Sequence, residues 1–170
     1  MAPPLEAHFA NEEIDHGLKV EPKLRNGTNI HAPTPTNAPN GAKTINTKDL
    51  VLMYRNRGNK PLVLDVLQNA ALSRQTLPEA VWLSGAGWEA ESVNPEIERN
   101  LIAAMKQLAP SKDKPVVTYC LNHDCWLSWN AAMRLAKIGY KNVFWYRGGI
   151  QSWRAAGLPV IETPLGAHLY

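Results

Sequence analysis

The stretch that decides the fold is Val116-Val117-Thr118-Tyr119-Cys120-Leu121-Asn122-His123-Asp124-Cys125-Trp126-Leu127-Ser128. Its first four residues, introduced by Pro115, form the apolar and β-branched run that is typical of a strand buried in a parallel sheet. A short loop with both cysteines of the chain follows the run, and a helical pattern begins after the loop. Ser128 is the predicted N-cap of this helix, and Gly139 is the expected stop.

Cys120 is the predicted nucleophile of the chain. A strand that passes directly into a helix leaves backbone N–H groups of the connecting loop at the carboxyl edge of the sheet, where they favour anions. These groups and the helix N-terminus stabilise a thiolate, which is the reactive form of a cysteine.

Composition limits the classes of function. The 170 residues suit one α/β domain with its own core, and a net charge of +3 with scattered basic residues gives no reason to expect nucleic-acid binding. No apolar run is long enough for a membrane helix, so we expect no membrane insertion. The first residues lack the basic start and apolar core of an export signal, which leaves two expectations: a cytoplasmic protein, or a secreted protein whose signal peptide has been removed. Two cysteines fit a disulfide in an oxidising compartment and a dithiol in a reducing one.

Strand and helix patterns alternate outside the central stretch. Strands are expected over residues 42–45, 61–66, 80–83, 116–119 and 142–146, and helices from Thr47 to Gly58, from Pro95 to Pro110 and from Gly148 to Gly157. This order predicts an α/β fold with a central parallel sheet of about five strands and helices on both faces. Residues 42–165 form the predicted domain, residues 1–41 an extended or partly disordered N-terminal arm, and residues 166–170 a C-terminal tail.

Several motifs resemble the landmarks of a rhodanese domain over residues 42 to 162. They are Leu64-Asp65-Val66, Leu77-Pro78-Glu79-Ala80-Val81-Trp82-Leu83, Val117-Thr118-Tyr119-Cys120, and Tyr146-Arg147-Gly148-Gly149-Ile150-Gln151-Ser152-Trp153 with Ala156-Gly157-Leu158-Pro159. Within that family, Cys125-Trp126-Leu127-Ser128-Trp129-Asn130-Ala131-Ala132 and Val143-Phe144-Trp145-Tyr146 are similar to a narrower group. This group is named for a paired-cysteine-tryptophan motif and is associated with pyrroloquinoline quinone (PQQ)-dependent alcohol catabolism.

The resemblance implies a persulfide-forming Cys120, cradled by backbone N–H groups of residues 121–126, and export to the periplasm. The loop also differs from ordinary rhodanese loops. Seven residues separate Cys120 from Ser128 where five are usual, and the segment from Leu121 to Leu127 has neither a permanent cation nor a glycine. These differences count against thiosulfate, a dianion, as the donor.

Four functions fit these residues. Cys120 can carry sulfur as a persulfide, with the loop amides stabilising its charge, or Cys125 can resolve a persulfide or mixed disulfide on Cys120 in thiol-redox chemistry. The cysteines and His123 have the spacing of soft metal ligands, although no fourth ligand is evident. A catalytically inert module that binds a partner through exposed tryptophans such as Trp126 is the alternative from another class.

The sequence therefore predicts a sulfurtransferase or thiol-redox protein with a site at the carboxyl edge of the sheet. The catalytic residues are Cys120 and Cys125, the substrate-binding residues are Leu121, Asn122, His123, Asp124 and Trp126, and the supporting residues are Asp65, Ser128, Asn130 and Arg147. Asp65, Asn130 and Arg147 are each more often a brace than a ligand. We expect no metal and no cofactor apart from a transient persulfide on Cys120. The expected partners are a small sulfur donor or thiol acceptor and a PQQ-dependent dehydrogenase or its electron acceptor.

Overall fold

The fold is described from a computed structural model, which covers residue 9 and residues 11–68, 74–162 and 167–170. Residues 1–8 and 10 of the predicted arm, residues 69–73 and 163–165 of the predicted domain, and residue 166 of the predicted tail lie outside the described residues. The division of the chain into arm, domain and tail stays a prediction.

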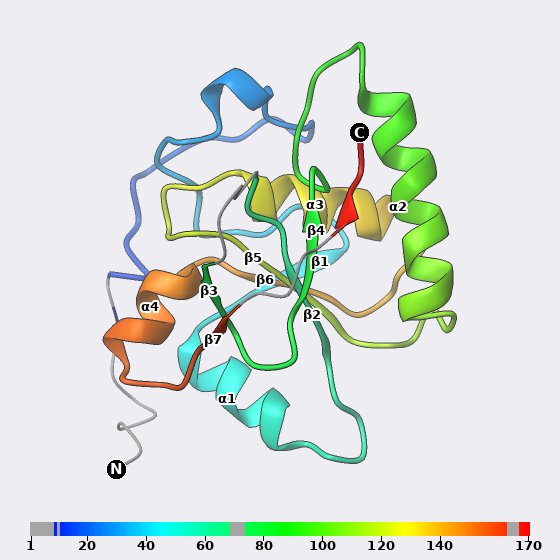
Figure 1. The fold of residues 1–170 in the computed structure, drawn as a ribbon. Helices are drawn as coiled ribbons and strands as arrows, with labels where there is room; N and C mark the ends of the chain where they lie inside the picture. Colours follow the sequence, from blue (N-terminus) through cyan, green and yellow to red (C-terminus); the bar gives the residue numbers. More distant parts are fainter. Residues whose placement is uncertain (1–8, 10, 69–73, 163–166) are drawn as a thin grey trace.

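A six-stranded parallel sheet forms the centre of the molecule (Figure 1). In the order β1-β6-β5-β2-β4-β8, its strands are Ala42–Ile45, Val143–Tyr146, Val116–Tyr119, Leu62–Asp65, Val81–Ser84 and Ala167–His168. Five of them correspond to the predicted strands, and the sixth, β8, comes from the predicted tail. A separate antiparallel pair, β3 (Gln75–Thr76) with β7 (Ile161–Glu162), was not predicted.

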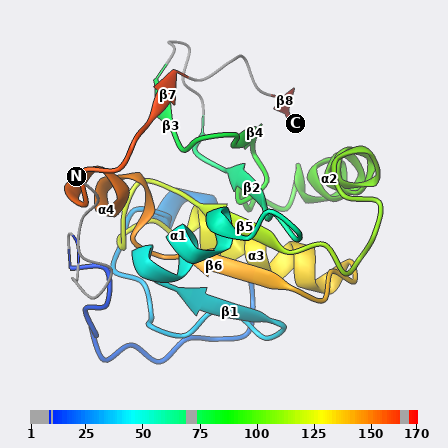
Figure 2. The same cartoon turned by 90° about the horizontal axis from the view of Figure 1, so that it is seen from below.

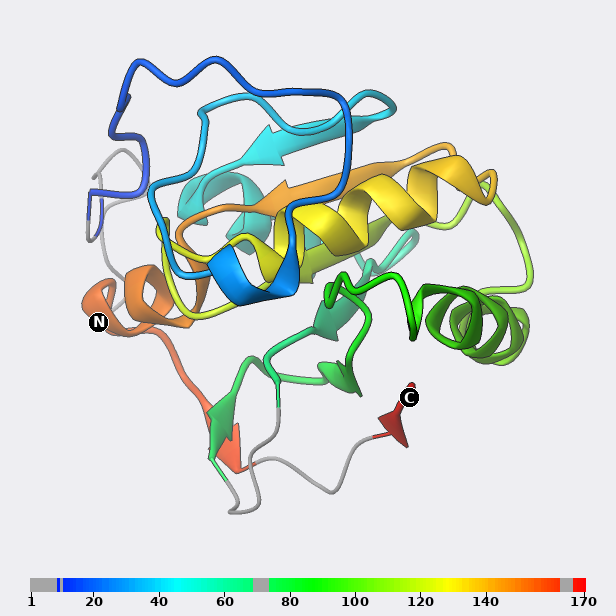
Figure 3. The same cartoon turned by 90° about the horizontal axis from the view of Figure 1, so that it is seen from above.

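In the described part of the chain, four α-helices cover both faces of the sheet, as predicted. They are α1 (Thr47–Arg55), α2 (Asn94–Leu108), α3 (Leu127–Lys137) and α4 (Gly149–Ala155). Leucines and other apolar side chains of α1 and α4 pack with one face of the sheet, and those of α2 and α3 pack with the other face. Accordingly, α1 lies in front of the sheet in Figure 2 and behind it in Figure 3, where α3 is in front.

The predicted N-cap of α3, Ser128, is wrong. Helix α1 is capped by Asn46: its side chain accepts from the Asp49 N–H while the Asp49 side chain accepts from the Asn46 N–H, a capping box. Helix α3 begins at Leu127, with Trp126 at the N-cap position and no side-chain cap. Ser128 therefore lies inside the first turn, where its hydroxyl accepts a hydrogen bond from Trp145 Nε1 at 2.8 Å.

The described part of the N-terminal arm lies against the domain along the beginning of α3 (Figure 3). It contains a short 3-10 helix, Gly27–Asn29, that Asn26 caps by accepting from the Thr28 N–H. The Gly27 N–H donates to the Glu89 carbonyl at 2.8 Å, which ties this turn to the segment before α2. None of the helices in the described ranges is long and apolar enough to cross a membrane.

Candidate functional site

Cys120 lies directly after β5, at the carboxyl ends of the parallel strands. The chain then turns through the cysteine loop, residues 120–126, into α3. The start of α4 fixes this turn, because the Ile150 N–H donates to the Cys120 carbonyl at 3.1 Å. Gly149 permits that approach: its φ is +65°, and a Cβ there would lie 2.4 Å from the Cys120 carbonyl oxygen.

A disulfide joins Cys120 to Cys125 across the loop, with the two Cα atoms 6.2 Å apart. Both residues are buried, each with 1% of its surface exposed. The sequence left open whether the two cysteines pair, and in the structure they are bonded. In this oxidised form neither sulfur is a thiolate, so neither is a nucleophile or a soft metal ligand.

The predicted open cradle of backbone amides is wrong for residues 124 and 126. The Asp124 N–H donates to Asn122 Oδ1 at 2.9 Å, an Asx turn within the loop. The Trp126 N–H donates to the Ile30 carbonyl of the arm at 2.8 Å. These two donors are thus already satisfied by the protein, and an anion at the disulfide would have to displace their partners.

The arm covers the cysteine loop. His31 of the arm forms an isolated antiparallel bridge with Cys125, and the Thr34 hydroxyl donates to the His123 carbonyl. Trp126 is held from two sides: its Nε1 donates to the Pro33 carbonyl at 3.1 Å, and the Arg25 guanidinium lies 4.7 Å from its ring centroid. Access to the sulfurs therefore requires the arm to move.

Asn130 and Arg147 hold the arm in place. Asn130 is fully buried, and its side chain bonds both backbone groups of Arg25 and the Gly87 carbonyl. Arg147 Nε and Nη2 donate to the hydroxyl and carbonyl oxygens of Thr34 at 3.0 and 2.9 Å, and Nη1 donates to the Glu12 carbonyl at 3.1 Å. Burial lowers the pKa of Arg147 from its ordinary value.

Asp65 lies at the end of β2, in the strand next to β5, and is fully buried. Arg74 pairs with both of its carboxylate oxygens. Thr76 Oγ1 and Tyr119 Oη donate to Oδ2 at 2.7 and 2.8 Å, and the Leu67 N–H donates to Oδ1 at 3.1 Å. With this set of partners Asp65 braces the loop after β2.

The remaining loop side chains lie around the disulfide. Leu121, Asn122, His123 and Asp124 are half-buried, while Trp126 is buried with 3% exposed. His123 Nδ1 lies 3.0 Å from Asp124 Oδ1, and His16 of the arm brings its Nε2 to 3.8 Å from the same oxygen. Sequence reasoning did not select His16, Arg25 or Thr34, because the arm has no periodicity that would place its residues against the loop.

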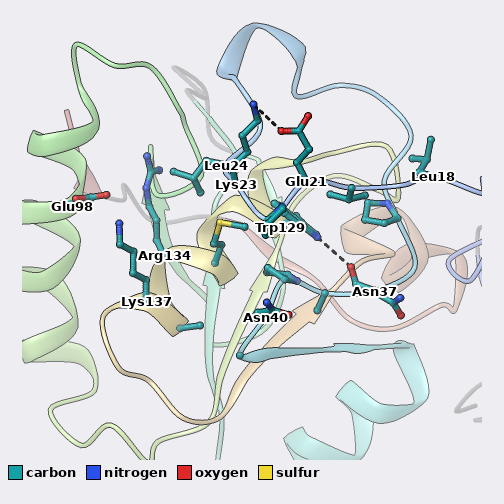
Figure 4. A pocket seen from close by; sticks show the side chains of 18 residues that line it. Leu18, Glu21, Lys23, Leu24, Asn37, Asn40, Glu98, Trp129, Arg134 and Lys137 are labelled. Atoms are coloured by element: carbon teal, nitrogen blue, oxygen red, sulfur yellow. Dashed lines mark hydrogen bonds and ion pairs between the residues drawn. The ribbon is translucent and has the colours of Figure 1, made fainter.

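A cavity of about 820 Å³ lies on the other side of the arm, between the arm, the outer surface of α3 and Glu98 of α2. Figure 4 shows Trp129 at its centre, where Trp129 Nε1 donates to the Asn37 carbonyl at 3.3 Å. Arg134 and Lys137 of α3 line the same cavity, and neither cysteine does. The cavity is therefore separate from the disulfide.

Comparisons with known proteins agree with this fold. The family model of the rhodanese-like domain matches residues 47–156. The BH2092 protein of Bacillus halodurans has 24% identity and a TM-score of 0.55, with 69% of this chain and 75% of that chain covered. A full-length protein of Lactobacillus plantarum has 20% identity and a TM-score of 0.53, with coverage of 71% and 88%.

A thiosulfate sulfurtransferase of Pseudomonas aeruginosa is also similar, with 16% identity and a TM-score of 0.52. The match covers 82% of this chain and 22% of that chain. At these identities the solved structures show the fold alone. No curated protein matches the chain in sequence.

Proposed function

The chain belongs to the family of rhodanese-like domains, and from this premise we propose that it handles sulfur by thiol–disulfide chemistry, with Cys120 as nucleophile and Cys125 as resolving thiol. The observation that supports the proposal most directly is the disulfide itself. It joins the cysteine that follows β5 to a second cysteine five positions further along the chain. A second thiol this close reacts with a group on the first much faster than a thiol from solution does.

The proposed cycle begins when a dithiol reductant opens the disulfide and becomes a disulfide itself. The Cys120 thiolate then attacks the sulfane sulfur of a small donor, and the rest of the donor leaves with the electron pair of the broken sulfur–sulfur bond. This leaves a persulfide on Cys120. The Cys125 thiol next loses its proton and attacks Cys120 Sγ, so that the Cys120–Cys125 bond forms and the carried sulfur leaves as hydrosulfide. The carried sulfur is reduced in this step, and the two cysteines are oxidised.

The loop side chains set the choice of donor in this proposal. Leu121, Asn122, His123 and Trp126 would form the walls around the sulfur, and Asp124 adds a negative charge beside it. Two arginines lie nearby, but each is already engaged. Arg25 of the arm lies over the Trp126 ring, and Arg147 donates to the Thr34 and Glu12 carbonyls of the arm. A neutral or weakly charged donor or acceptor thiol therefore suits the site better than a dianion.

Mass spectrometry of the intact protein tests the proposal. The reduced protein and its Cys120→Ser and Cys125→Ser variants are each treated with thiosulfate and, separately, with polysulfide. We expect Cys125→Ser to gain one sulfur atom, the unaltered protein to return to the disulfide form with release of hydrosulfide, and Cys120→Ser to do neither. If Cys125→Ser gains no sulfur from either donor, the proposal is wrong.

A catalytically inert, partner-binding rhodanese-like module is the second candidate. The burial of both sulfurs under the arm favours it, because the described surface offers no direct path to the disulfide. Absence of sulfur uptake in all variants, with equal partner binding by the unaltered protein and Cys120→Ser, would support this function instead.

The cellular setting rests on the resemblance of the Cys125-Trp126 region to the paired-cysteine-tryptophan group. It leads us to propose a periplasmic protein accessory to PQQ-dependent alcohol oxidation, with a quinoprotein dehydrogenase or its electron acceptor as partner. A disulfide persists in an oxidising compartment. Trapping the cysteines in living cells with an alkylating reagent tests the location: an oxidised pair fits the periplasm, and a reduced pair fits the cytoplasmic alternative.

A further inference from the structure

Three metal-ligating side chains meet at the outer edge of the cysteine loop. His16 comes from the arm, and His123 and Asp124 are neighbours within the loop. One ligand atom from each of the three lies within 4.8 Å of the other two. The two imidazole ring centroids are 5.7 Å apart, so the rings are direct neighbours.

The ligand atoms themselves are covered and lack hydrogen bonds. Among the residues that the structure describes, His16 Nε2, His123 Nδ1 and Asp124 Oδ1 are all inaccessible to water and make no hydrogen bond. A buried polar atom without a hydrogen bond destabilises the fold, and such atoms are rare in native proteins. The nearest polar neighbours of these atoms are one another, at 3.0 and 3.8 Å from Asp124 Oδ1, so a single cation between them would serve all three.

We propose that His16 Nε2, His123 Nδ1 and Asp124 Oδ1 bind a divalent transition-metal ion of the zinc class. Two neutral imidazoles and one carboxylate are the protein ligands of many catalytic zinc and ferrous sites, which keep further positions for water. Four ligands about 2.1 Å from zinc lie roughly 3.4 Å apart in a tetrahedron. The distances of 3.0 and 3.8 Å from Asp124 Oδ1 to the two nitrogens fall on either side of that value.

The ion would join the arm to the cysteine loop. His16 lies far from His123 and Asp124 in the sequence, and the arm between them covers Cys125 through His31. Bound metal would therefore hold the cover over the disulfide and slow its reduction. All three ligand atoms are nitrogen or oxygen, so the metal can bind while the two cysteines remain in the disulfide.

Calorimetric titration of Zn²⁺ into the oxidised, tag-free, chelator-treated protein tests the proposal. We expect one ion per chain, and a visible d–d spectrum when Co²⁺ replaces Zn²⁺. His16→Gln, His123→Gln and Asp124→Asn should each weaken Zn²⁺ binding at least tenfold. His31→Gln is the matched control, since His31 is an exposed histidine of the same arm and is outside the cluster, and it should bind Zn²⁺ normally.

A second measurement separates loss of a ligand from loss of the fold. Circular dichroism of each metal-free variant should match that of the metal-free protein. Zn²⁺ should slow reduction of the disulfide by a phosphine in the unaltered protein and in His31→Gln, but not in His16→Gln. Absence of Zn²⁺ binding by the unaltered protein would overturn the proposal. Zn²⁺ binding by folded His16→Gln or His123→Gln that is as tight as binding by the unaltered protein would also overturn it. In that case the direct contact of His123 with Asp124 would account for the cluster.

Discussion

Asn130 bonds both backbone polar groups of Arg25: its Oδ1 accepts from the Arg25 N–H at 2.8 Å, and its Nδ2 donates to the Arg25 carbonyl at 2.8 Å. The side-chain amide of Asn130 thus takes the place that the backbone amide of a neighbouring strand has in a β-sheet. It fixes the arm beside α3 at the place from which Arg25 reaches over Trp126. The position of the arm over the disulfide thus depends on a buried amide of the helix.

Replacement of Asn130 by alanine should release the arm. Loss of two hydrogen bonds to Arg25 and one to the Gly87 carbonyl should lower the free energy of unfolding by about 2–3 kcal/mol. Reduction of the disulfide by a phosphine should become faster, because the sulfurs become accessible. Asn142→Ala is the control, since Asn142 is exposed and the one hydrogen bond of its side chain in the described structure goes to the Asp113 carbonyl. An unchanged reduction rate in Asn130→Ala would show that the arm does not limit access.

Asp65→Asn should destabilise the fold without loss of the disulfide. The change leaves the Arg74 guanidinium without its buried counter-charge and replaces an acceptor oxygen by a donor beside Thr76 and Tyr119. Breaking a buried ion pair in this way costs about 3–5 kcal/mol. Urea unfolding measures the loss. Stability within 1 kcal/mol of the unaltered protein, a bound about the size of one hydrogen bond, would contradict the role of Asp65 as a brace.

The disulfide should contribute little to global stability. Its cysteines are separated by 5 positions, and closing so short a loop in the unfolded chain is worth about 2 kcal/mol. The difference in the free energy of unfolding between the oxidised and the reduced protein, measured in urea, checks this value. A difference of more than about 4 kcal/mol would mean that reduction also disrupts the arm or the core.

Stability should decline in alkaline solution as the buried tyrosines are forced to ionise. Burial is the main cause that raises the pKa of Tyr146 and of Tyr119 above the ordinary value, with Asp65 adding to the effect on Tyr119. Below about pH 10 both groups are protonated in the folded and the unfolded chain. Above it the unfolded chain loses these protons while the folded chain keeps them, so the free energy of unfolding falls as the pH rises.

Thermal unfolding between pH 8 and 11.5 measures this decline. Tyr146→Phe should show a shallower decline, because it removes one of the groups that ionise on unfolding. Tyr146 Oη bonds Thr47 Oγ1 at 2.7 Å, so the variant is expected to be less stable at neutral pH, and the slope is the quantity to compare. Tyrosinate absorbance that appears before unfolding and is lost in Tyr146→Phe would refute the argument.

Sequence reasoning predicted the regular elements of the domain well and the arm poorly. The strand before Cys120 was visible because four apolar or β-branched residues in succession suit a strand buried on both faces. Strands β3, β7 and β8 have two residues each, too few for any period to be recognised. The arm is held against the domain by hydrogen bonds to individual side chains such as Asn130 and Arg147. Contacts of this kind leave no periodic pattern in the sequence.

The candidate site shows the same division. The position of Cys120 followed from a local strand–loop–helix pattern, and the family match covers that pattern. The N–H groups of residues 124 and 126 are bonded to Asn122 and to Ile30, respectively. Ile30 is far from the loop in the sequence, so this contact could not be predicted from the local pattern. Ser128 was predicted as an N-cap from its residue type alone. In the structure its hydroxyl instead accepts a hydrogen bond from the indole nitrogen of the buried Trp145.

Strand β8 covers the open edge of β4 at one side of the sheet. Ala167 and His168 pair with Leu83 and Ser84, and the Leu169 N–H donates to the Ser84 carbonyl at 2.9 Å. Without this short strand, the backbone of β4 would present open donors and acceptors to a second copy of the chain. Residues 167–169 therefore cover this edge of the sheet, and their removal should favour self-association through pairing of the exposed β4 edge.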